Sequence, residues 1–110
     1  MGRKNTIETL KRDNLIVQIL LRHKGRDNAI DYRGLTKEVS ANGFELKEAS
    51  VHTIIARIKF ERNVPICSLD SGEYYWAKDK QDVLESINHL QKKVDGLNEH
   101  IEFYKNFLID

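Results

Sequence analysis

Residues 51–77 have the sequence VHTIIARIKFERNVPICSLDSGEYYWA, in which a helical pattern gives way to a strand-like one. The apolar residues of its first half are three or four positions apart, as on the buried face of a helix. They are Val51, Ile54, Ile55 and Ile58. Pro65 has no N–H group for a helical hydrogen bond, so it cannot continue that helix. The stretch therefore predicts a helix from about Lys47 to Arg62.

Two short runs after this helix predict a β-hairpin. Residues 64–68 and 73–77 are rich in β-branched and aromatic side chains, and residues 69–72 between them form a turn sequence that ends in glycine. An isolated hairpin is only marginally stable. We therefore expect the hairpin to pack on the helices before it, with Cys67 as a small core residue rather than a nucleophile.

A first helix is expected near the start of the chain. Its apolar face comprises Leu15, Ile16, Ile19 and Leu20. Asp13 can cap the beginning of this helix and Gly25 can end it. Residues 6–10 either extend the helix backwards or form a separate turn.

A second, shorter helix is expected over residues 32–41. Residues 26–30 before it are predicted to form a loop that leads into a short extended piece. Leu35 and Val39 stand one helical turn apart, as core contacts do, and Asn42-Gly43 is a helix stop. The predicted fold class is thus mainly α with a small β-hairpin, and we expect residues 1–78 to form one domain.

Residues 79–110 are expected to form a separate dimerisation helix, regular to about Ile109. Its apolar residues alternate at steps of four and three, which is the a/d seam of a coiled coil. The predicted dimerisation residues are Val83, Ile87, Leu90, Val94, Leu97, Ile101, Tyr104 and Leu108. β-branched residues at a with leucine at d favour two parallel strands. The alternative is an amphipathic helix that folds back on its own domain.

The order helix, helix, tight turn, helix, hairpin resembles the winged helix-turn-helix superfamily over residues 13–77, closest to small prokaryotic and phage-borne members. The residues that carry this resemblance are Pro65-Ile66-Cys67-Ser68, Gly72 and Tyr74-Tyr75-Trp76-Ala77. The family often has a basic residue at the tip of the wing, whereas residues 69–72 here are neutral to acidic. We therefore expect the reading of bases to depend on the helix around residues 50–57.

The resemblance implies that the third helix enters the major groove of double-stranded DNA. The residues expected to face the groove are Ser50, His52, Thr53 and Arg57, and those expected to contact phosphates are Lys47, Lys59, Arg33 and Lys37. A basic N-terminal arm could add Arg3, Lys4, Lys11 and Arg12. Glu45 and Glu48 are interpreted as stabilising the start of the helix.

Charge is distributed unevenly along the chain. The net charge is +1, but residues 1–65 carry +5 and residues 66–110 carry −4. This asymmetry suggests that the front of the molecule faces a polyanion. The single cysteine fits a reducing compartment, and no signal-peptide core is recognised, so a cytoplasmic location is expected. The longest apolar run, residues 15–21, is too short to span a membrane.

Catalytic and metal sites are not expected. The four histidines are scattered and have no cysteine partner at ligand spacing, and no phosphate-binding glycine loop or nucleophile–base pair is recognised. We therefore predict no enzyme, no cofactor and no metal. The leading hypothesis is a dimeric DNA-binding regulator or phage-type accessory factor. The alternative is a winged-helix module that binds another protein, as an adaptor or inhibitor, without sequence-specific DNA binding.

Overall fold

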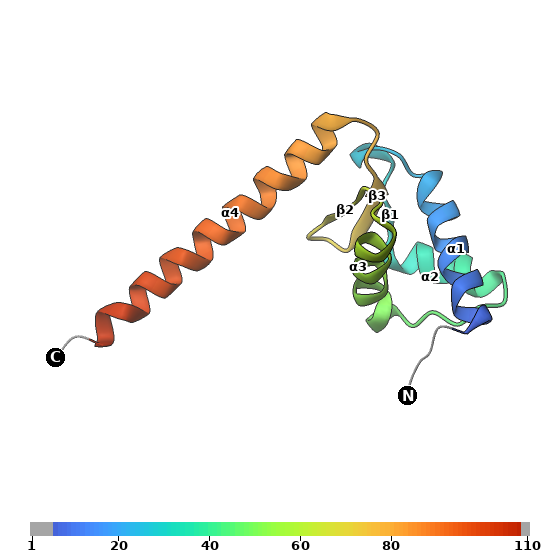
Figure 1. Cartoon of the computed structure of the whole chain (residues 1–110), viewed down its shortest axis with the longest axis horizontal. Coiled ribbons are helices and arrows are strands. Elements are labelled where there is room, and N and C mark those ends of the chain that lie inside the picture. The colour runs from blue at the N-terminus through green and yellow to red at the C-terminus, as the bar shows by residue number, and fades with distance from the viewer. Residues whose placement is uncertain (1–5, 109–110) are drawn as a thin grey trace.

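A computed structural model describes residues 6–108 and shows a small head from which one long helix extends (Figure 1). We call residues 6–78 the head and residues 79–108 the tail. The elements, in chain order, are α1 (Ile7–Leu21), η1 (Arg26–Asn28), β1 (Ile30–Asp31), α2 (Tyr32–Ala41), η2 (Glu48–Ser50), α3 (Val51–Arg62), β2 (Ile66–Leu69), β3 (Glu73–Trp76), α4 (Lys80–Lys105) and η3 (Asn106–Leu108). The η elements are single turns of 3₁₀ helix.

Helix α1 begins earlier than its apolar pattern suggested. Thr6 caps it, since its Oγ1 accepts a hydrogen bond from the Thr9 N–H at 3.1 Å. The prediction that Asp13 caps this helix is therefore wrong, and residues 6–10 belong to the helix. Asp13 lies in the middle of α1 and is only 1% exposed. A buried carboxylate in a helix needs a partner, and the partner comes from α3.

Helix α2 has the predicted bounds. Asp31 Oδ1 accepts the Gly34 N–H at 2.7 Å and so caps its start. Asn42 ends it, and Gly43 follows with a φ of 89°. The third predicted helix begins later than expected: residues 48–50 form a 3₁₀ turn and α3 starts at Val51.

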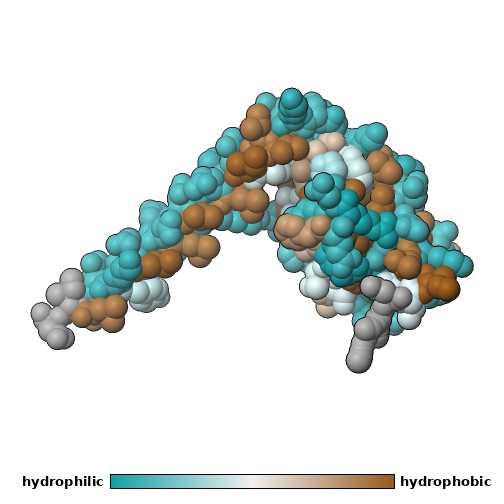
Figure 2. Space-filling view, viewed as in Figure 1, coloured by the Kyte–Doolittle hydropathy of each residue, from teal (hydrophilic) through white to brown (hydrophobic). Residues whose placement is uncertain are grey.

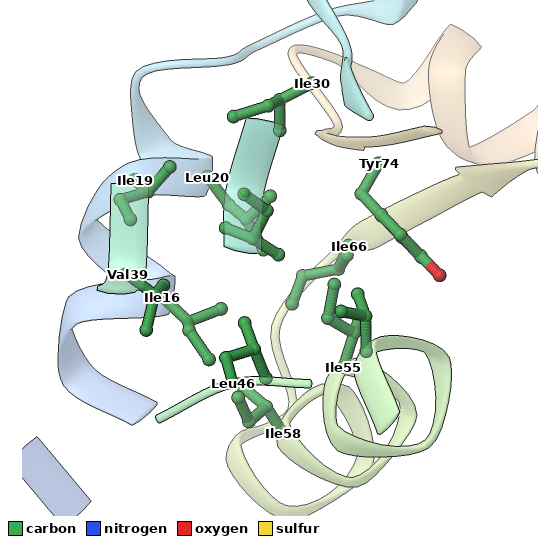
Figure 3. Packing of buried hydrophobic residues seen from close by; sticks show 12 residues of the cluster. Ile16, Ile19, Leu20, Ile30, Val39, Leu46, Ile55, Ile58, Ile66 and Tyr74 are labelled. Carbon is green, nitrogen blue, oxygen red and sulfur yellow. The ribbon is translucent and has the colours of Figure 1, made fainter. Parts of the chain in front are cut away.

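The core lies between α1, α2, α3 and the inner face of the sheet (Figure 3). Its buried members are Ile16, Ile19, Leu20, Ile30, Leu35, Val39, Leu46, Val51, Ile55, Ile58, Ile66 and Tyr74. Most of these are the residues whose spacing predicted the helices. Packing of these apolar faces therefore fixes how α3 is presented on the surface.

The sheet has three antiparallel strands in the order β1-β3-β2. Sequence analysis predicted the hairpin β2–β3, and the structure adds β1, in which Ile30 pairs with Tyr74 and Asp31 with Glu73. A strand of two residues is too short for an alternating pattern, which is why only a short extended piece was expected there. β1 covers the free edge of β3 and joins the hairpin to the start of α2.

The hairpin has apolar residues on both faces. Ile66 and Tyr74 face the helical core, whereas Cys67 and Tyr75 pair across the strands and are buried on the other side. The tail contacts β2, so the first turns of α4 cover that outer face. The expectation that Cys67 is a buried core residue is confirmed. The junction between head and tail is thus a small core of its own.

Helix α4 leaves the head and does not fold back over it within residues 80–105 (Figure 1). Asp79 caps it by accepting the Asp82 N–H at 3.1 Å. The described residues measure 60 Å along their longest axis, which reflects the projecting tail. Gly96 lies in the middle of α4, with no atom within 4 Å of where a Cβ would stand. Ile109 lies outside the described residues.

The hairpin turn approaches α2 closely at Gly72, so a substitution there measures how tightly the turn packs against that helix. Its φ is 85°, and an added Cβ would stand 2.9 Å from Tyr32 Cδ1. We expect Gly72→Ala to lower the free energy of unfolding by about 2–3 kcal/mol, from left-handed strain plus this clash. Gly43→Ala is the matched control, since its φ is 89° but the space is open. It should cost only about 1 kcal/mol in urea denaturation. Equal losses in the two variants would show that Tyr32 moves aside freely.

Candidate functional site

The start of α3 presents a short polar surface. His52 and Thr53 are exposed in its first turn, and Lys47 is exposed just before η2. Ser50, at the N-cap of α3, is half-buried and its side chain makes no capping hydrogen bond. His52 Nδ1 lies 3.5 Å from Tyr74 Oη, so this surface is continuous with the hairpin. Four of the residues predicted from the sequence therefore lie together at one end of α3.

Helix α2 adds two cations beside this surface. Arg33 and Lys37 are both exposed and lie one turn apart, on one face of α2. The Arg33 guanidinium lies over the Tyr32 ring, 5.3 Å from its centroid. Since α2 packs against both η2 and α3, these cations are carried by the helix next to the start of α3. Arg3 and Lys4 of the predicted basic arm lie outside the described residues.

Arg57 points back toward α1 instead of standing alone on the surface. Its Nη2 lies 2.8 Å from Asp13 Oδ2, and its Nη1 lies 2.9 Å from Glu61 Oε1. Burial lowers the pKa of Arg57, but the hydrogen bonds to these two carboxylates outweigh burial, so the pKa of Arg57 lies above its ordinary value. Since the guanidinium is already bound, we leave Arg57 out of the proposed interface. No local pattern could have revealed a partner 44 positions away.

The far end of α3 has a different character. Phe60 is 78% exposed, and the Lys59 ammonium lies over its ring, 4.9 Å from the centroid. No role was predicted for Phe60 from the sequence. Its position, two residues beyond the buried Ile58, was the available signal, because that spacing turns a side chain away from the core. Lys59 therefore covers an exposed aromatic ring on the outer side of α3.

The tip of the hairpin is attached to the tail. Asp70 Oδ1 lies 2.7 Å from Lys93 Nζ and 3.2 Å from His89 Nε2, both on α4. The turn thus contributes an acidic group that is already paired, and residues 69–72 include no cation. The tip of the hairpin therefore presents no free cation to solvent within residues 69–72.

The Asp70 contacts predict a titration that can be measured. Hydrogen bonds from Lys93 and then His89 lower the pKa of Asp70. A carboxylate with a lowered pKa stabilises the folded chain above the unfolded pKa of about 3.9, and this contribution is lost as pH falls through the folded value. We expect NMR titration of the Asp70 carboxyl to give a midpoint below about 3.9. Lys93→Met should raise it.

Lys105→Met is the matched control for this titration. Lys105 pairs with Glu102 within α4 and does not contact the hairpin. The variant should leave the Asp70 midpoint unchanged. A midpoint that Lys93→Met also leaves unchanged would mean that the hairpin and α4 are not joined through this pair.

The predicted seam of the tail is exposed along its whole length. Figure 2 shows hydrophobic residues as a continuous band on one side of α4, turned toward the angle between tail and head. All eight predicted dimerisation residues belong to it, at 40% to 82% exposure. A folded monomer rarely leaves such a long apolar band in water. The band is therefore a candidate surface for association.

Cavities are shallow, and no metal site is formed by the described residues. A cavity of about 360 Å³ lies between the start of α3, the hairpin and Lys93, and one of about 270 Å³ lies between the hairpin and α4. No three His, Cys, Asp or Glu side chains within residues 6–108 are grouped to hold a metal ion. None of the helices in this range combines the length and apolar character needed to cross a bilayer.

No protein-family model, curated protein or solved structure matches the chain. Its function is therefore inferred from two surfaces: the polar start of α3 with its flanking cations, and the apolar band of α4.

Proposed function

We propose that this protein is a winged helix-turn-helix DNA-binding protein that acts as a homodimer, as a transcriptional regulator or a DNA-binding accessory factor. The observation that carries the proposal is the start of α3, where Lys47, His52 and Thr53 are exposed, Ser50 is half-buried, and the neighbouring helix α2 carries two exposed cations. A helix of this kind fits the major groove of B-DNA, and its first turn reaches base edges.

The order of elements supports this assignment. Three helices and a three-stranded antiparallel sheet, whose last two strands form a hairpin after α3, are the arrangement that the winged helix-turn-helix requires. Residues 1–65 carry the positive net charge, as expected of the part that faces phosphates. The free, buried Cys67 suits the reducing cytoplasm, where we place the protein.

In this proposal the two kinds of residue have different roles. Arg33, Lys37 and Lys47 bind phosphates and fix the position of α3 along the duplex. Ser50, His52 and Thr53 contact base edges. Lys59 contributes less, because its ammonium lies over Phe60. The hairpin holds the tail and leaves the minor groove empty.

Salt-dependent titration tests the phosphate contacts. Binding to a selected genomic fragment should be tighter than binding to random DNA. Lys37→Gln should reduce the slope of log affinity against log salt by about 0.9, the value for one phosphate contact. Lys92→Gln, a change of the same charge on the outer side of α4, should leave the slope unchanged. Identical slopes for Lys37→Gln and the unaltered chain would remove α2 from the interface.

One observation favours a second candidate function, that of a module that binds another protein. Phe60 is an exposed aromatic ring on the outer face of α3, and aromatic side chains are common at the centres of protein interfaces. Phe60→Ser separates the two functions. It should leave DNA affinity within about threefold if α3 binds DNA through its first turn, and it should abolish capture of a protein partner that survives nuclease treatment.

A further inference from the structure

The apolar band of α4 becomes wider at its C-terminal end. Phe103 and Phe107 lie outside the a/d seam and are 55% and 73% exposed, with ring centroids 5.3 Å apart in an edge-to-face arrangement. Phe107 follows Ser86 by three heptads, and Phe103 follows His89 by two. Phe103 is on α4 and Phe107 is on the η3 turn that follows it, and their spacing continues the side of α4 that, nearer the head, meets the hairpin.

We propose that the second copy packs antiparallel along α4, with Val83 of each copy against Leu108 of the other. This inference rests on the homodimer in the proposed function and adds its orientation. The register is the one in which the two bands overlap completely, so it removes the largest apolar area from water.

The seam residues match one another in this register. Each a residue faces a d residue of the second copy, and the four kinds of contact are Val83 with Leu108, Ile87 with Tyr104, Leu90 with Ile101, and Val94 with Leu97. A smaller side chain thus meets a larger one in three of the four. Cores pack well when large and small side chains alternate across facing positions.

The β-branched residues at a favour a parallel pair, but the individual layers of a parallel pair match less well here. Each seam residue would then face the same residue of the second copy. Valine would meet valine at positions 83 and 94, and tyrosine would meet tyrosine at position 104. The layers would differ widely in volume, and the two Tyr104 hydroxyl groups would be brought together. Phe103 and Phe107 would remain in water at the far end, about 20–30 Å along the helix from the residues that contact the hairpin.

The antiparallel pair gives these aromatic rings a surface on the second copy to pack against. In antiparallel coils the residues beside the seam face the same heptad position of the other helix. Phe107 then lies beside Ser86 of the second copy, where the hairpin of that copy meets its own α4. The aromatic end of each tail therefore closes over the head–tail junction of the other copy, and neither junction is complete in a single chain.

This orientation also sets the distance between the heads. The seam from Val83 to Leu108 is about 38 Å long at the rise of an α-helix. The two heads lie at opposite ends of it, related by a two-fold axis that crosses the coil. This seam length is of the same order as the 34–36 Å between successive major grooves on one side of DNA, so the pair has the scale of a binder with two half-sites.

Cysteine cross-linking tests the orientation. Leu90 faces Ile101 of the second copy in the antiparallel pair, so the double variant Leu90→Cys/Ile101→Cys should form a covalent dimer on mild oxidation. Neither single variant should do so. Within one chain the two positions are about 16 Å apart along α4, too far for an internal disulfide. The unaltered chain, with its buried Cys67, is the control for oxidation.

The outcomes distinguish failure of the orientation from failure of the dimer. Efficient cross-linking of either single variant would show a parallel pair and overturn the inference, while the dimer stands. A solution mass equal to one chain would overturn both, and a mass of three or more chains would overturn the two-stranded coil. Phe107→Ser gives a second measurement: it should weaken dimerisation about tenfold in the antiparallel pair. An unchanged dissociation constant would contradict it.

Discussion

Replacing Asp13 with alanine is expected to lower the free energy of unfolding by about 2–3 kcal/mol, as removal of one partner of a buried ion pair does. The Asp13 side chain is only 2% exposed and binds Arg57 at 2.8 Å and Arg12 at 3.4 Å. Without it, two guanidinium groups remain next to the core with little to neutralise them. The value is at the low end because the Arg57 side chain is about one-third exposed and water can reach it.

Two variants make this prediction specific. Glu61→Gln removes the exposed partner of the same arginine and should cost less than about 0.5 kcal/mol. Asp13→Leu combined with Arg57→Met removes both charges and should recover most of the lost stability, because apolar pairs of similar size replace buried ion pairs well. Urea denaturation measures all three. A loss in Asp13→Ala no larger than that in Glu61→Gln would mean that the pair does not join α1 to α3.

Introducing aspartate at both Leu90 and Leu97 is expected to abolish self-association. Both leucines are in the seam, and the double variant would bury four carboxylates in each pair of tails. The dissociation constant should rise by at least about 1,000-fold, so the solution mass should fall to the 12.8 kDa of one chain. Affinity for a two-site DNA fragment should fall by about 100-fold or more, since two linked heads bind more tightly than one.

The control places two new carboxylates on the other side of α4 and also removes the Lys92 ammonium, so it changes the net charge by one unit more than the seam variant. Asn88→Asp combined with Lys92→Asp changes two exposed residues outside the seam and should preserve the dimer. Circular dichroism of both tail variants at equal concentration checks that α1 to α3 remain folded. A seam variant that is still dimeric would show that the copies meet elsewhere.

Much of the fold was predictable because its helices have regular apolar spacings. The bounds of α2 followed from local patterns such as Leu35 with Val39, which report directly on burial. The long α4 followed from its heptad spacing, although its regular helix ends at Lys105 and not at the expected Ile109. The parts that were not predicted depend on contacts between distant residues. An aspartate that caps a helix and one that is buried beside an arginine look the same in a sequence, so Asp13 was assigned to the wrong role.

The candidate site was predictable in its position but not in its details. Residue type and spacing placed His52 and Thr53 at the start of a helix, and the structure has them exposed there. Sequence alone could not show that Arg57 is bound to α1, since its partner is remote in the chain. Nor could it show that Asp70 holds the tail, because a turn and a helix face 23 positions apart share no pattern.

Gly96 has a consequence for how the protein responds to its own abundance. A glycine in a helix interior costs about 1 kcal/mol relative to alanine, and a lone helix exposed on every side is marginal in water. When tails pair as proposed, ordering the middle of α4 and joining a second copy become a single event. The concentration of assembled dimer then rises with the square of the free-chain concentration, so in the proposed function the occupancy of a two-site DNA target increases more steeply than the protein level.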